Sequence, residues 1–376
     1  MSRDQIATAK RIVIKIGSSS LTGAAGSELD PVAVDRLVDL VVAARKRGAE
    51  VVVVSSGAIA AGLAPLGLKT RPKDLAMQQA AASVGQGLLI HRYTESFARY
   101  QVTASQVLLT TQDVIRRSHY KNAQQALNRL LSLGVVPVIN ENDTVGTQEI
   151  RFGDNDRLAA LVALLIGADL LVLISDIDAL YDAPPSQAGA RRITEVQSVA
   201  DIDDSTLGGV GSAGVGSGGM LTKIEAARIS TSAGIPMLLT SLAQSTQSMS
   251  GEDFGTYFHA HASRTNSRML WLAHASTPTG RLIIDAGAVT ALIERGVSLL
   301  PAGVTAVEGE FSAGDAVEIT GQDGRVIARG LVAFDSVEIP QMLGRSTKEL
   351  AKELGPEYER ELVHRDDLVL LGFPPQ

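Results

Sequence analysis

The chain has 376 residues and no cysteine; 45% of its residues are hydrophobic, only 4% are aromatic, and its formal net charge is −7. This length and composition predict a soluble globular protein of two or three domains with a mainly aliphatic core, and they exclude an intrinsically disordered chain. Without cysteine, disulfides, thiolate metal sites and a thiol nucleophile are excluded.

The distribution of charge argues against a nucleic-acid-binding protein. Residues 281–370 contain 9 Lys and Arg against 16 Asp and Glu, whereas the rest of the chain contains 25 of each kind. Binding to phosphates needs clustered Lys and Arg, which this acidic region lacks. We therefore do not expect RNA binding.

The sequence predicts a cytoplasmic protein. Its first residues include basic side chains but no long apolar stretch followed by a cleavage site. The longest apolar stretch, residues 158–174, is interrupted by Gly167 and Asp169, so we do not expect it to span a membrane.

Strands and helices alternate over the first 240 residues. Residues 11–16 (RIVIKI) predict a buried strand, and Asp30 and Pro31 predict the cap and start of a helix that ends near Gly48. This alternation predicts an α/β fold with a doubly wound, mainly parallel sheet. Further strands are expected at 50–54, 102–109, 135–139, 169–174 and 235–239, and further helices at 74–100, 119–132, 155–166 and 220–233.

Polar clusters follow four of these predicted strands: Gly17–Ser20, Ser55–Gly57, Asn140–Asp143 and Ser175–Asp176. Ligands of doubly wound sheets bind beyond the carboxyl ends of the parallel strands. The regular placement of the clusters therefore predicts a ligand site at that edge of the sheet.

The pattern changes near residue 266, where a turn-rich segment leads into shorter elements. Strands are expected at 281–284, 316–319 and 326–332, with a short helix at 286–294. They predict a smaller, β-rich domain of the α+β or β-barrel type. We place the first domain at 1–265, a linker at 266–280 and the small domain at 281–370.

A glycine run precedes the last helix of the first domain. Seven glycines lie within residues 208–219, directly before Thr222 and Lys223. The run is either a flexible linker or a cradle whose free backbone N–H groups bind an anion, aided by the helix dipole. The chain has no Walker A motif, so a P-loop is excluded.

Two lysines are candidates for binding phosphate. Lys15 lies in a predicted central strand, where an ammonium group is costly to bury unless it meets an anion, so a solvated edge lysine is the weaker interpretation. Lys223, taken alone, would be interpreted as a surface lysine. With the strand-end clusters, however, the two favour a phosphate site that includes Ser217–Lys223.

Two Asn/Asp clusters, residues 140–143 and 153–156, are candidates for binding a small zwitterion. Each could be an ordinary turn or helix cap, because Asn and Asp favour both. A carboxylate would bind the ammonium group of an amino acid and amides would orient its carboxylate, which suits two clusters better than capping does. The six histidines show no convincing metal-ligand spacing.

Together these motifs resemble the glutamate 5-kinase family, which joins an amino acid kinase fold to a PUA domain. The resemblance covers nearly the whole chain, and its motifs lie at residues 13–19, 55–62, 137–143, 152–156, 218–223 and 363–367. It implies phosphorylation of the γ-carboxylate of L-glutamate by ATP, the first step of proline biosynthesis, with proline as a feedback inhibitor. Mg²⁺ would be carried by the ATP phosphates. We also expect a homo-oligomer (a dimer or tetramer) and hand-over of the labile product to glutamyl phosphate reductase.

The resemblance further implies roles for individual residues. Lys15 and Lys223 would hold the transferring phosphoryl group, and Asp156 would orient them or accept from the substrate's amino group. Glutamate would be bound by Ser56, Asp143 and Asn155. The ATP site would comprise Lys15, Ser175, Asp176, Ser217, Gly218, Gly219, Met220, Leu221, Thr222 and Lys223.

One segment departs from the family pattern. Residues 175–181 read SDIDALY, with Ala179 where the family usually has a glycine, and alanine adopts φ > 0 less easily. Three rival interpretations are an amino acid kinase for acetylglutamate, aspartate, carbamate or UMP, an RNA-binding protein, and a non-catalytic amino acid sensor. The paired Asn/Asp clusters favour free glutamate, the acidic C-terminal region disfavours RNA, and a sensor has no evident need for two lysines.

Overall fold

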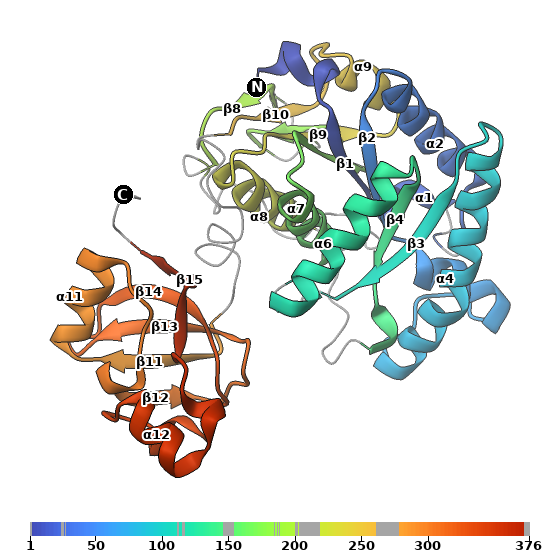
Figure 1. Ribbon diagram of the computed structural model, residues 1–376. Coiled ribbons are helices and arrows are strands. Elements are labelled where there is room, and N and C mark those ends of the chain that lie inside the picture. Colours follow the sequence, from blue (N-terminus) through green and yellow to red (C-terminus); the bar gives the residue numbers. More distant parts are fainter. Residues whose placement is uncertain are drawn as a thin grey trace. The chain divides into compact units, whose positions relative to one another are not determined.

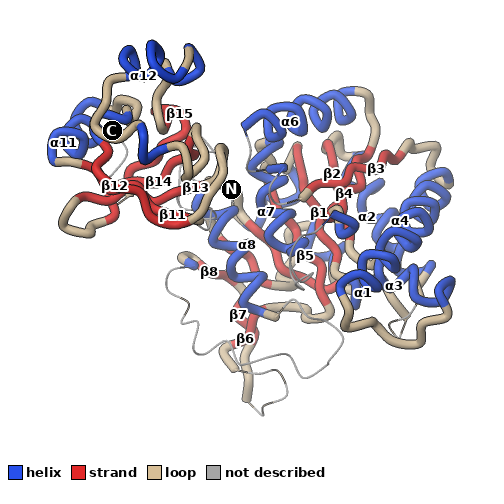
Figure 2. The backbone as a smooth tube through the Cα atoms, turned by 90° about the horizontal axis from the view of Figure 1, so that it is seen from below, coloured by secondary structure: helices blue, strands red, loops and turns tan. Residues whose placement is uncertain are grey.

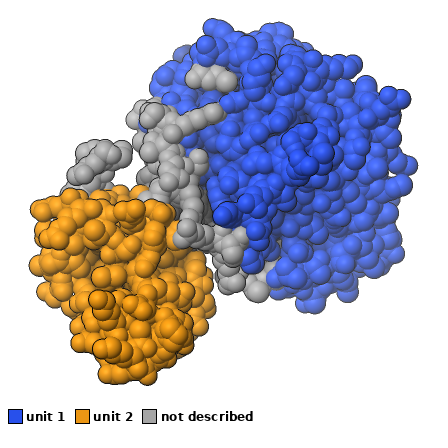
Figure 3. All heavy atoms as spheres, in the orientation of Figure 1, with its two compact units in different colours: residues 1–114, 119–264 blue, residues 115–118, 265–376 orange. Residues whose placement is uncertain are grey.

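Figure 1 shows a computed structural model of the chain, which describes residues 2–23, 26, 28–110, 113–114, 117–145, 154–183, 185, 187, 189–199, 202, 219–260 and 278–371. The chain divides into two compact units. The first contains residues 1–114 and 119–264, and the second contains residues 115–118 and 265–376 (Figure 3). Most of the predicted linker, 266–280, lies outside the described residues.

The first unit is built on an eight-stranded sheet with the order β3-β4-β2-β1-β5-β9-β10-β8. Six of its strands run parallel to one another, whereas β10 is antiparallel to β9 and β8 runs parallel to β10. This topology confirms the predicted doubly wound, mainly parallel sheet. The strands are β1 (Arg11–Ile16), β2 (Glu50–Ser55), β3 (Ala104–Leu109), β4 (Val136–Glu141), β5 (Leu170–Ser175), β8 (Glu195–Val196), β9 (Met237–Ser241) and β10 (Thr256–Phe258), and β6 (Leu180–Tyr181) pairs separately with β7 (Arg192–Ile193).

Helices cover both faces of this sheet (Figure 2). Helices α2 and α4 lie on one face, and α6, α7 and α8 lie on the other. Within the described ranges, no helix combines the length and the apolar composition needed to cross a bilayer. The helices of this unit are η1 (Arg3–Thr8), α1 (Ser18–Leu21), α2 (Pro31–Lys46), α3 (Ala58–Leu63), η2 (Ala64–Leu66), α4 (Leu75–Ala98), α6 (Arg117–Ser132), η3 (Asp143–Val145), α7 (Asp154–Ile166), α8 (Met220–Ser232) and α9 (Ser245–Met249).

Strand β1 is central, because it pairs with β2 on one side and β5 on the other. Its side chains alternate between the two faces of the sheet. Ile14 and Ile16 pack into the core formed with α2 and α4. Lys15 lies between them in sequence and therefore projects to the opposite face, toward α7 and α8.

The polar cluster at 140–143 begins inside a strand, whereas it was expected to follow one. The predicted strand 135–139 continues through Asn140 and Glu141, which pair with Leu108 and Leu109 of β3. Asn155 and Asp156 lie in the first turn of α7, where the predicted helix 155–166 places them. An acidic residue at a helix N-terminus is favoured by the helix dipole, which explains why this polar segment is compatible with helix.

The second unit contains a five-stranded sheet with the order β12-β11-β13-β14-β15 around its own core. The predicted strands and helix correspond to β11, β13, β14 and α11, which confirms the smaller β-rich domain. The sequence reasoning missed β12, β15 and α12. The elements are β11 (Gly280–Ile284), α11 (Ala286–Arg295), η5 (Pro301–Gly303), β12 (Val304–Gly309), β13 (Ala316–Gly321), β14 (Val326–Val332), η6 (Ile339–Gln341), α12 (Thr347–Leu354), η7 (Pro356–Tyr358) and β15 (Val363–Leu370).

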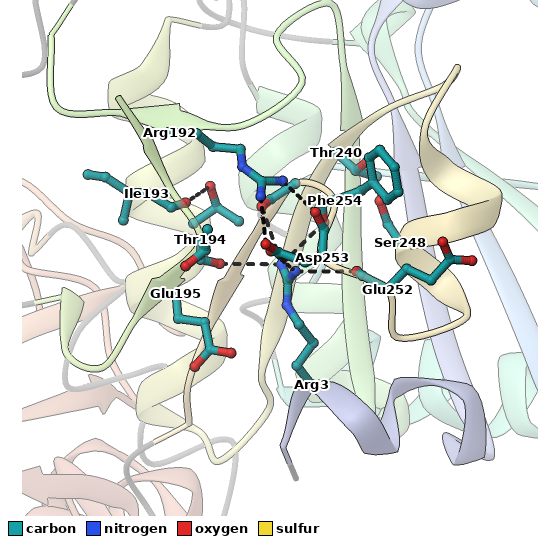
Figure 4. A network of polar contacts seen from close by, with 12 residues as sticks. Arg3, Arg192, Ile193, Thr194, Glu195, Thr240, Ser248, Glu252, Asp253 and Phe254 are labelled. Carbon is teal, nitrogen blue, oxygen red and sulfur yellow. Dashed lines mark hydrogen bonds and ion pairs between the residues drawn. The ribbon is translucent and has the colours of Figure 1, made fainter. Parts of the chain in front are cut away.

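A buried arginine fastens the N-terminal turn to the far edge of the first sheet (Figure 4). Arg3 of η1 donates to Asp253 Oδ1 at 2.8 Å and to the carbonyl oxygens of Thr194 and Gly255 at 3.3 and 3.2 Å. Arg192 binds the other oxygen of Asp253 at 2.9 Å. Burial lowers the pKa of Arg3 and the Asp253 carboxylate opposes that shift, so Asp253 compensates the cost of burying the guanidinium.

Two glycines allow α3 and α4 to touch through their backbones. A Cβ at Gly62 would lie 1.9 Å from the carbonyl oxygen of Ala81, and one at Gly85 would lie 1.8 Å from that of Ala58. No side chain larger than hydrogen fits at either position without moving a helix. The contact fixes the start of α3, directly after the polar turn at the end of β2, against the middle of α4.

We expect Gly85→Ala to lower the free energy of unfolding by roughly 1–3 kcal/mol, because the new methyl group must push α3 away from α4. Gly87→Ala is the matched control on the same helix. A Cβ there meets no atom within 4 Å, so this variant should gain about 0.5–1 kcal/mol from its better helix propensity. Urea denaturation followed by circular dichroism measures both. Equal effects of the two substitutions would contradict the close approach.

Candidate active site

Lys15 is buried at the centre of the sheet and paired with a carboxylate. Only 7% of its side chain is exposed, and its Nζ lies 2.5 Å from Asp156 Oδ1. The alternation of β1 places Lys15 on the face covered by α7, which carries Asp156 in its first turn. The expectation that this lysine meets an anion is met, although the anion within the chain is Asp156.

Helix α8 brings a second lysine to the same carboxylate. Lys223 Nζ lies 3.2 Å from Asp156 Oδ2, and Thr222 Oγ1 lies 2.9 Å from the same oxygen. The Lys223 side chain is only 5% exposed, so the surface-lysine interpretation is wrong. Lys15, Asp156 and Lys223 are called the lysine triad below.

The lysine triad carries two positive charges and one negative charge in a buried environment. Burial lowers the pKa of Lys15, Asp156 opposes this shift, and Lys223 adds to it. Burial alone would raise the pKa of Asp156, but Lys15 and Lys223 outweigh it and hold that pKa below its usual value. At neutral pH Asp156 is therefore ionised, and the triad as a whole attracts an anion.

A cluster of amides lies beside the triad. Asn155 Nδ2 is 2.9 Å from Ser56 Oγ, 3.3 Å from the Ser55 carbonyl oxygen and 3.1 Å from Asn140 Oδ1. Asn140 Nδ2 in turn donates to Gln86 Oε1 at 2.8 Å. Ser56, Gln86, Asn140 and Asn155 are called the amide cluster below. The structure thus brings together two of the three residues expected to bind the substrate.

The third, Asp143, begins the short helix η3. Its carboxylate is close enough to Arg71 to influence the pKa of that guanidinium group. Burial lowers the pKa of Arg71 to about 10, and the Asp143 carboxylate acts in the opposite direction. Arg71 was not recognised in the sequence, because it lies in an irregular segment with no periodic pattern.

The residues expected to bind nucleotide follow β5 and begin α8. Ser175 Oγ donates to Asp176 Oδ1 at 2.8 Å, and the Asp176 charge acts on Lys15, raising its pKa slightly. Gly219 is the N-cap of α8; Met220 and Leu221 form its first turn, with Leu221 58% exposed. Ser217 and Gly218, with the rest of the glycine run, lie outside the described residues.

Ala179 needs no unusual backbone at the place where the family usually has glycine. It is fully buried, and Gln101 is the one non-glycine residue with positive φ in the described part of the chain. The turn after β5 therefore accepts alanine without left-handed strain.

Two consecutive residues of α7 join the amide cluster to the lysine triad. Asn155 contacts Ser56 and Asn140, while Asp156 contacts both lysines. Their Cα atoms are about 3.8 Å apart. A group of the size of one carboxylate could therefore contact the amide cluster and a phosphoryl group at the triad together.

Comparison with known proteins identifies the family of both parts of the chain. Residues 10–241 match the model of the amino acid kinase family, and residues 280–354 match that of the PUA domain. A curated glutamate 5-kinase of Streptomyces avermitilis is 62% identical over 371 residues, which cover 98% of this chain and 99% of the relative. Another, from Thermobifida fusca, is 56% identical over 371 residues, with 98% and 95% covered.

The chain belongs to the glutamate 5-kinase family.

Solved structures of more distant proteins are also similar to this glutamate 5-kinase family member. A carbamate kinase from Giardia lamblia bound to AMP-PNP is 18% identical with a TM-score of 0.49, and the match covers 68% of this chain and 100% of that one. A UMP kinase from Bacillus anthracis is 13% identical with a TM-score of 0.45, covering 68% and 97%.

Sequence reasoning missed two residues of α4 that contact the candidate site of this glutamate 5-kinase family member. Gln86 accepts from Asn140, and the Tyr93 hydroxyl lies 2.9 Å from Ser55 Oγ, where burial raises the Tyr93 pKa. Helix α4 was predicted, but its alanine- and glutamine-rich sequence has no strongly amphipathic pattern. Nothing in the sequence alone therefore indicated which glutamine faces β4.

We expect Asp156→Asn to lower the free energy of unfolding by about 3–5 kcal/mol at pH 7, because it leaves two buried ammonium groups without their carboxylate. This loss should shrink as the pH rises toward 9.5. Burial lowers the pKa of folded Lys15 and Asp156 opposes that shift, so this pKa should lie lower in the variant than in wild type. The folded variant therefore releases the Lys15 proton at a lower pH, while the unfolded chain keeps it up to about pH 10.4, and the variant gains more stability with rising pH than wild type does.

Urea denaturation at several pH values compares this variant with wild type. Asp4→Asn, at an exposed position, is the control and should stay within about 0.5 kcal/mol of wild type at every pH. A destabilisation by Asp156→Asn that stays constant or grows between pH 7 and pH 9.5 would contradict the electrostatic account.

Proposed function

We propose that the chain transfers the γ-phosphoryl group of ATP to the γ-carboxylate of L-glutamate, which forms γ-glutamyl phosphate and ADP. The observation that carries this proposal is the position of Asp156 between two buried lysines, one residue from the amide cluster. The family's curated relatives are named glutamate 5-kinase, and the same site combines an anion-binding half with an amide-rich half.

The chemistry needs charge compensation rather than a general base. The γ-carboxylate of glutamate has a reference pKa near 4.3 and is ionised at neutral pH. One of its oxygens forms a bond to the γ-phosphorus while the bond from that phosphorus to the bridging oxygen of ADP breaks. Both reactants are anions, so Lys15 and Lys223 would offset their repulsion and neutralise the charge that develops on the phosphoryl oxygens.

Asp156 would hold the two lysines in place. Its two oxygens are divided between them, Oδ1 to Lys15 and Oδ2 to Lys223. Because its pKa is held low, Asp156 stays a carboxylate throughout the neutral range and would orient both lysine side chains. In this proposal it orients the lysines and does not itself bind the substrate's amino group.

The nucleotide would enter as MgATP over Ser175, Asp176 and the start of α8. Gly219 caps this helix, whose free N–H groups and dipole favour phosphate. In the described part of the chain, no group of three or more His, Cys, Asp and Glu side chains is arranged to hold a metal ion. We propose that Mg²⁺ is carried by the phosphates of ATP, where it would supply further positive charge.

Glutamate would bind over the amide cluster. Asp143 and the Oδ1 atom of Asn155 are acceptors suited to the α-ammonium group, and the Ser56 hydroxyl adds a further polar contact. Proline is also a zwitterion with one ammonium and one carboxylate group, which supports the proposal that it competes for this site as a feedback inhibitor. The activity would be the first step of proline biosynthesis in the cytoplasm.

The product is an acyl phosphate, which water hydrolyses readily. We propose that a homo-oligomer, a dimer or tetramer, hands it to glutamyl phosphate reductase. Hydroxylamine converts free acyl phosphate to a stable hydroxamate, so trapping with and without the reductase tests this hand-over. No change in trapped product on adding the reductase would contradict it.

A substrate panel tests the proposed activity itself. ADP release should depend on L-glutamate and should stay at background with acetylglutamate, aspartate, carbamate or UMP. Equal release with any of these would favour another amino acid kinase activity. Tight, salt-dependent RNA binding by the full chain would instead support a nucleic-acid function.

We expect Lys15→Ala and Lys223→Ala to lower kcat by about 10²–10³-fold, because each removes a preorganised charge at the transferring phosphoryl group. The glutamate KM should change far less. Lys10→Ala, on an exposed lysine five residues before Lys15, is the control and should keep wild-type kcat. Near wild-type turnover in either test variant would remove that lysine from the mechanism.

A further inference from the structure

The amide cluster has a direction that is set by a backbone group. Asn140 Oδ1 accepts from the backbone N–H of Glu141 at 2.9 Å. A side-chain amide can turn over in its site, but a backbone N–H always donates. Asn140 must therefore point its oxygen toward Glu141, and its nitrogen must point the other way.

The orientation of Asn140 determines how the side-chain amides of its two neighbours, Asn155 and Gln86, are oriented. Asn155 approaches Asn140 Oδ1 and must present its nitrogen there, at 3.1 Å. Gln86 approaches Asn140 Nδ2 and must present its oxygen, at 2.8 Å. Asn140 is only 2% exposed, so an orientation that brought two donors or two acceptors together would leave buried polar groups unsatisfied.

The two ends of the amide cluster, Asn155 and Gln86, therefore offer opposite atoms, an acceptor at one end and donors at the other. Asn155 Oδ1 is buried and has no hydrogen-bond partner among the described residues, so it remains an acceptor. Gln86 uses Oε1 for Asn140, which leaves the two N–H groups of Nε2 as donors. An acceptor at one end and a donor at the other match an amino acid zwitterion, whose ammonium group donates and whose α-carboxylate accepts.

The sheet order gives the separation between the strands that carry Lys15 and Asn140. Lys15 is on β1 and Asn140 on β4, and β2 lies between them. Neighbouring strands are about 4.8 Å apart, so β4 is about 10 Å from β1. Asn140 projects to the α4 face, as Val136 and Val138 of the same strand do, whereas Lys15 projects to the α7 face. A glutamate with its γ-carboxylate at the triad thus extends its α-carbon end toward Gln86.

We propose that Gln86 is a glutamate-binding residue whose Nε2 donates to the α-carboxylate of the substrate. The position of Gln86 relative to α3 is fixed by the neighbouring Gly85, where the backbone of α4 touches that of α3. The inference rests on the proposed glutamate kinase activity. It adds a contact that distinguishes glutamate from acids without an α-carboxylate.

Gln86→Met keeps the approximate volume of the side chain and removes both of its polar ends. We expect the glutamate KM to rise roughly 10- to 100-fold, the value of a hydrogen bond to a charged group, while the ATP KM stays within about twofold. 4-Aminobutyrate is glutamate without its α-carboxylate. Its inhibition constant as a competitor of glutamate should be the same in the variant and in wild type.

Gln86→Glu separates the direct contact from the hydrogen bonds of the amide cluster. It keeps an acceptor for Asn140 but replaces the donor with an oxygen that repels the α-carboxylate, so its glutamate KM should be raised at least as much as in Gln86→Met. Gln124→Met is the matched control. It removes a partly buried hydrogen bond of 2.7 Å from Gln124 Nε2 to the Leu165 carbonyl oxygen, which is not part of the candidate site. Its glutamate KM should equal that of wild type.

Three results would overturn the inference: an unchanged glutamate KM in Gln86→Met, a wild-type KM in Gln86→Glu, or an inhibition constant for 4-aminobutyrate that rises in parallel with the glutamate KM. The last would mean that Gln86 acts on the whole site rather than on the α-carboxylate. A wild-type protein without glutamate-dependent turnover would instead refute the proposed function, so the two failures are distinguishable.

Discussion

The arrangement of the first unit depends on one carboxylate that holds two buried ammonium groups. Asp156 touches Lys15 of β1 through one oxygen and Lys223 of α8 through the other. Two lysines in an apolar interior would repel each other and would each lose their hydration, and neither cost is offset without Asp156. The same three side chains carry an excess of one positive charge, which is what the proposed binding of a phosphoryl group would use.

The site depends equally on backbone packing that contains no charge. Gly62 and Gly85 bring α3 and α4 into backbone contact, and this contact sets the distance between the turn after β2 and the polar face of α4. The amide cluster spans that distance. Because Asn155 and Asp156 are consecutive residues at the start of α7, any shift of α7 moves the amide cluster and the lysine triad together. Under the proposed function, the parts that would bind glutamate and phosphate are therefore joined through a single helical turn.

The second unit has its own sheet and core, and it carries the acidic excess of the chain. Part of its charge is arranged in pairs across the sheet. Glu318 of β13 lies between Arg281 of β11 and Arg329 of β14, at 3.3 and 3.5 Å. Partly exposed pairs of this kind contribute little stability each.

The sequence by itself determined six strands of the first sheet, the five long helices of the first unit, the parallel arrangement and the family, because hydrophobic periodicity, glycine breaks and motif order are local properties. It also predicted that Lys15 must meet an anion. It missed the short edge strands β8 and β10. Only the tertiary structure decided which groups meet. Lys223 reaches a carboxylate 67 residues away and Gln86 reaches an amide 54 residues away, and both contacts depend on the strand order and on which face of each strand a side chain occupies. The orientation of the side-chain amides in the amide cluster is likewise a tertiary property, because it is set by one backbone N–H at the end of β4 and by the helices packed against that strand.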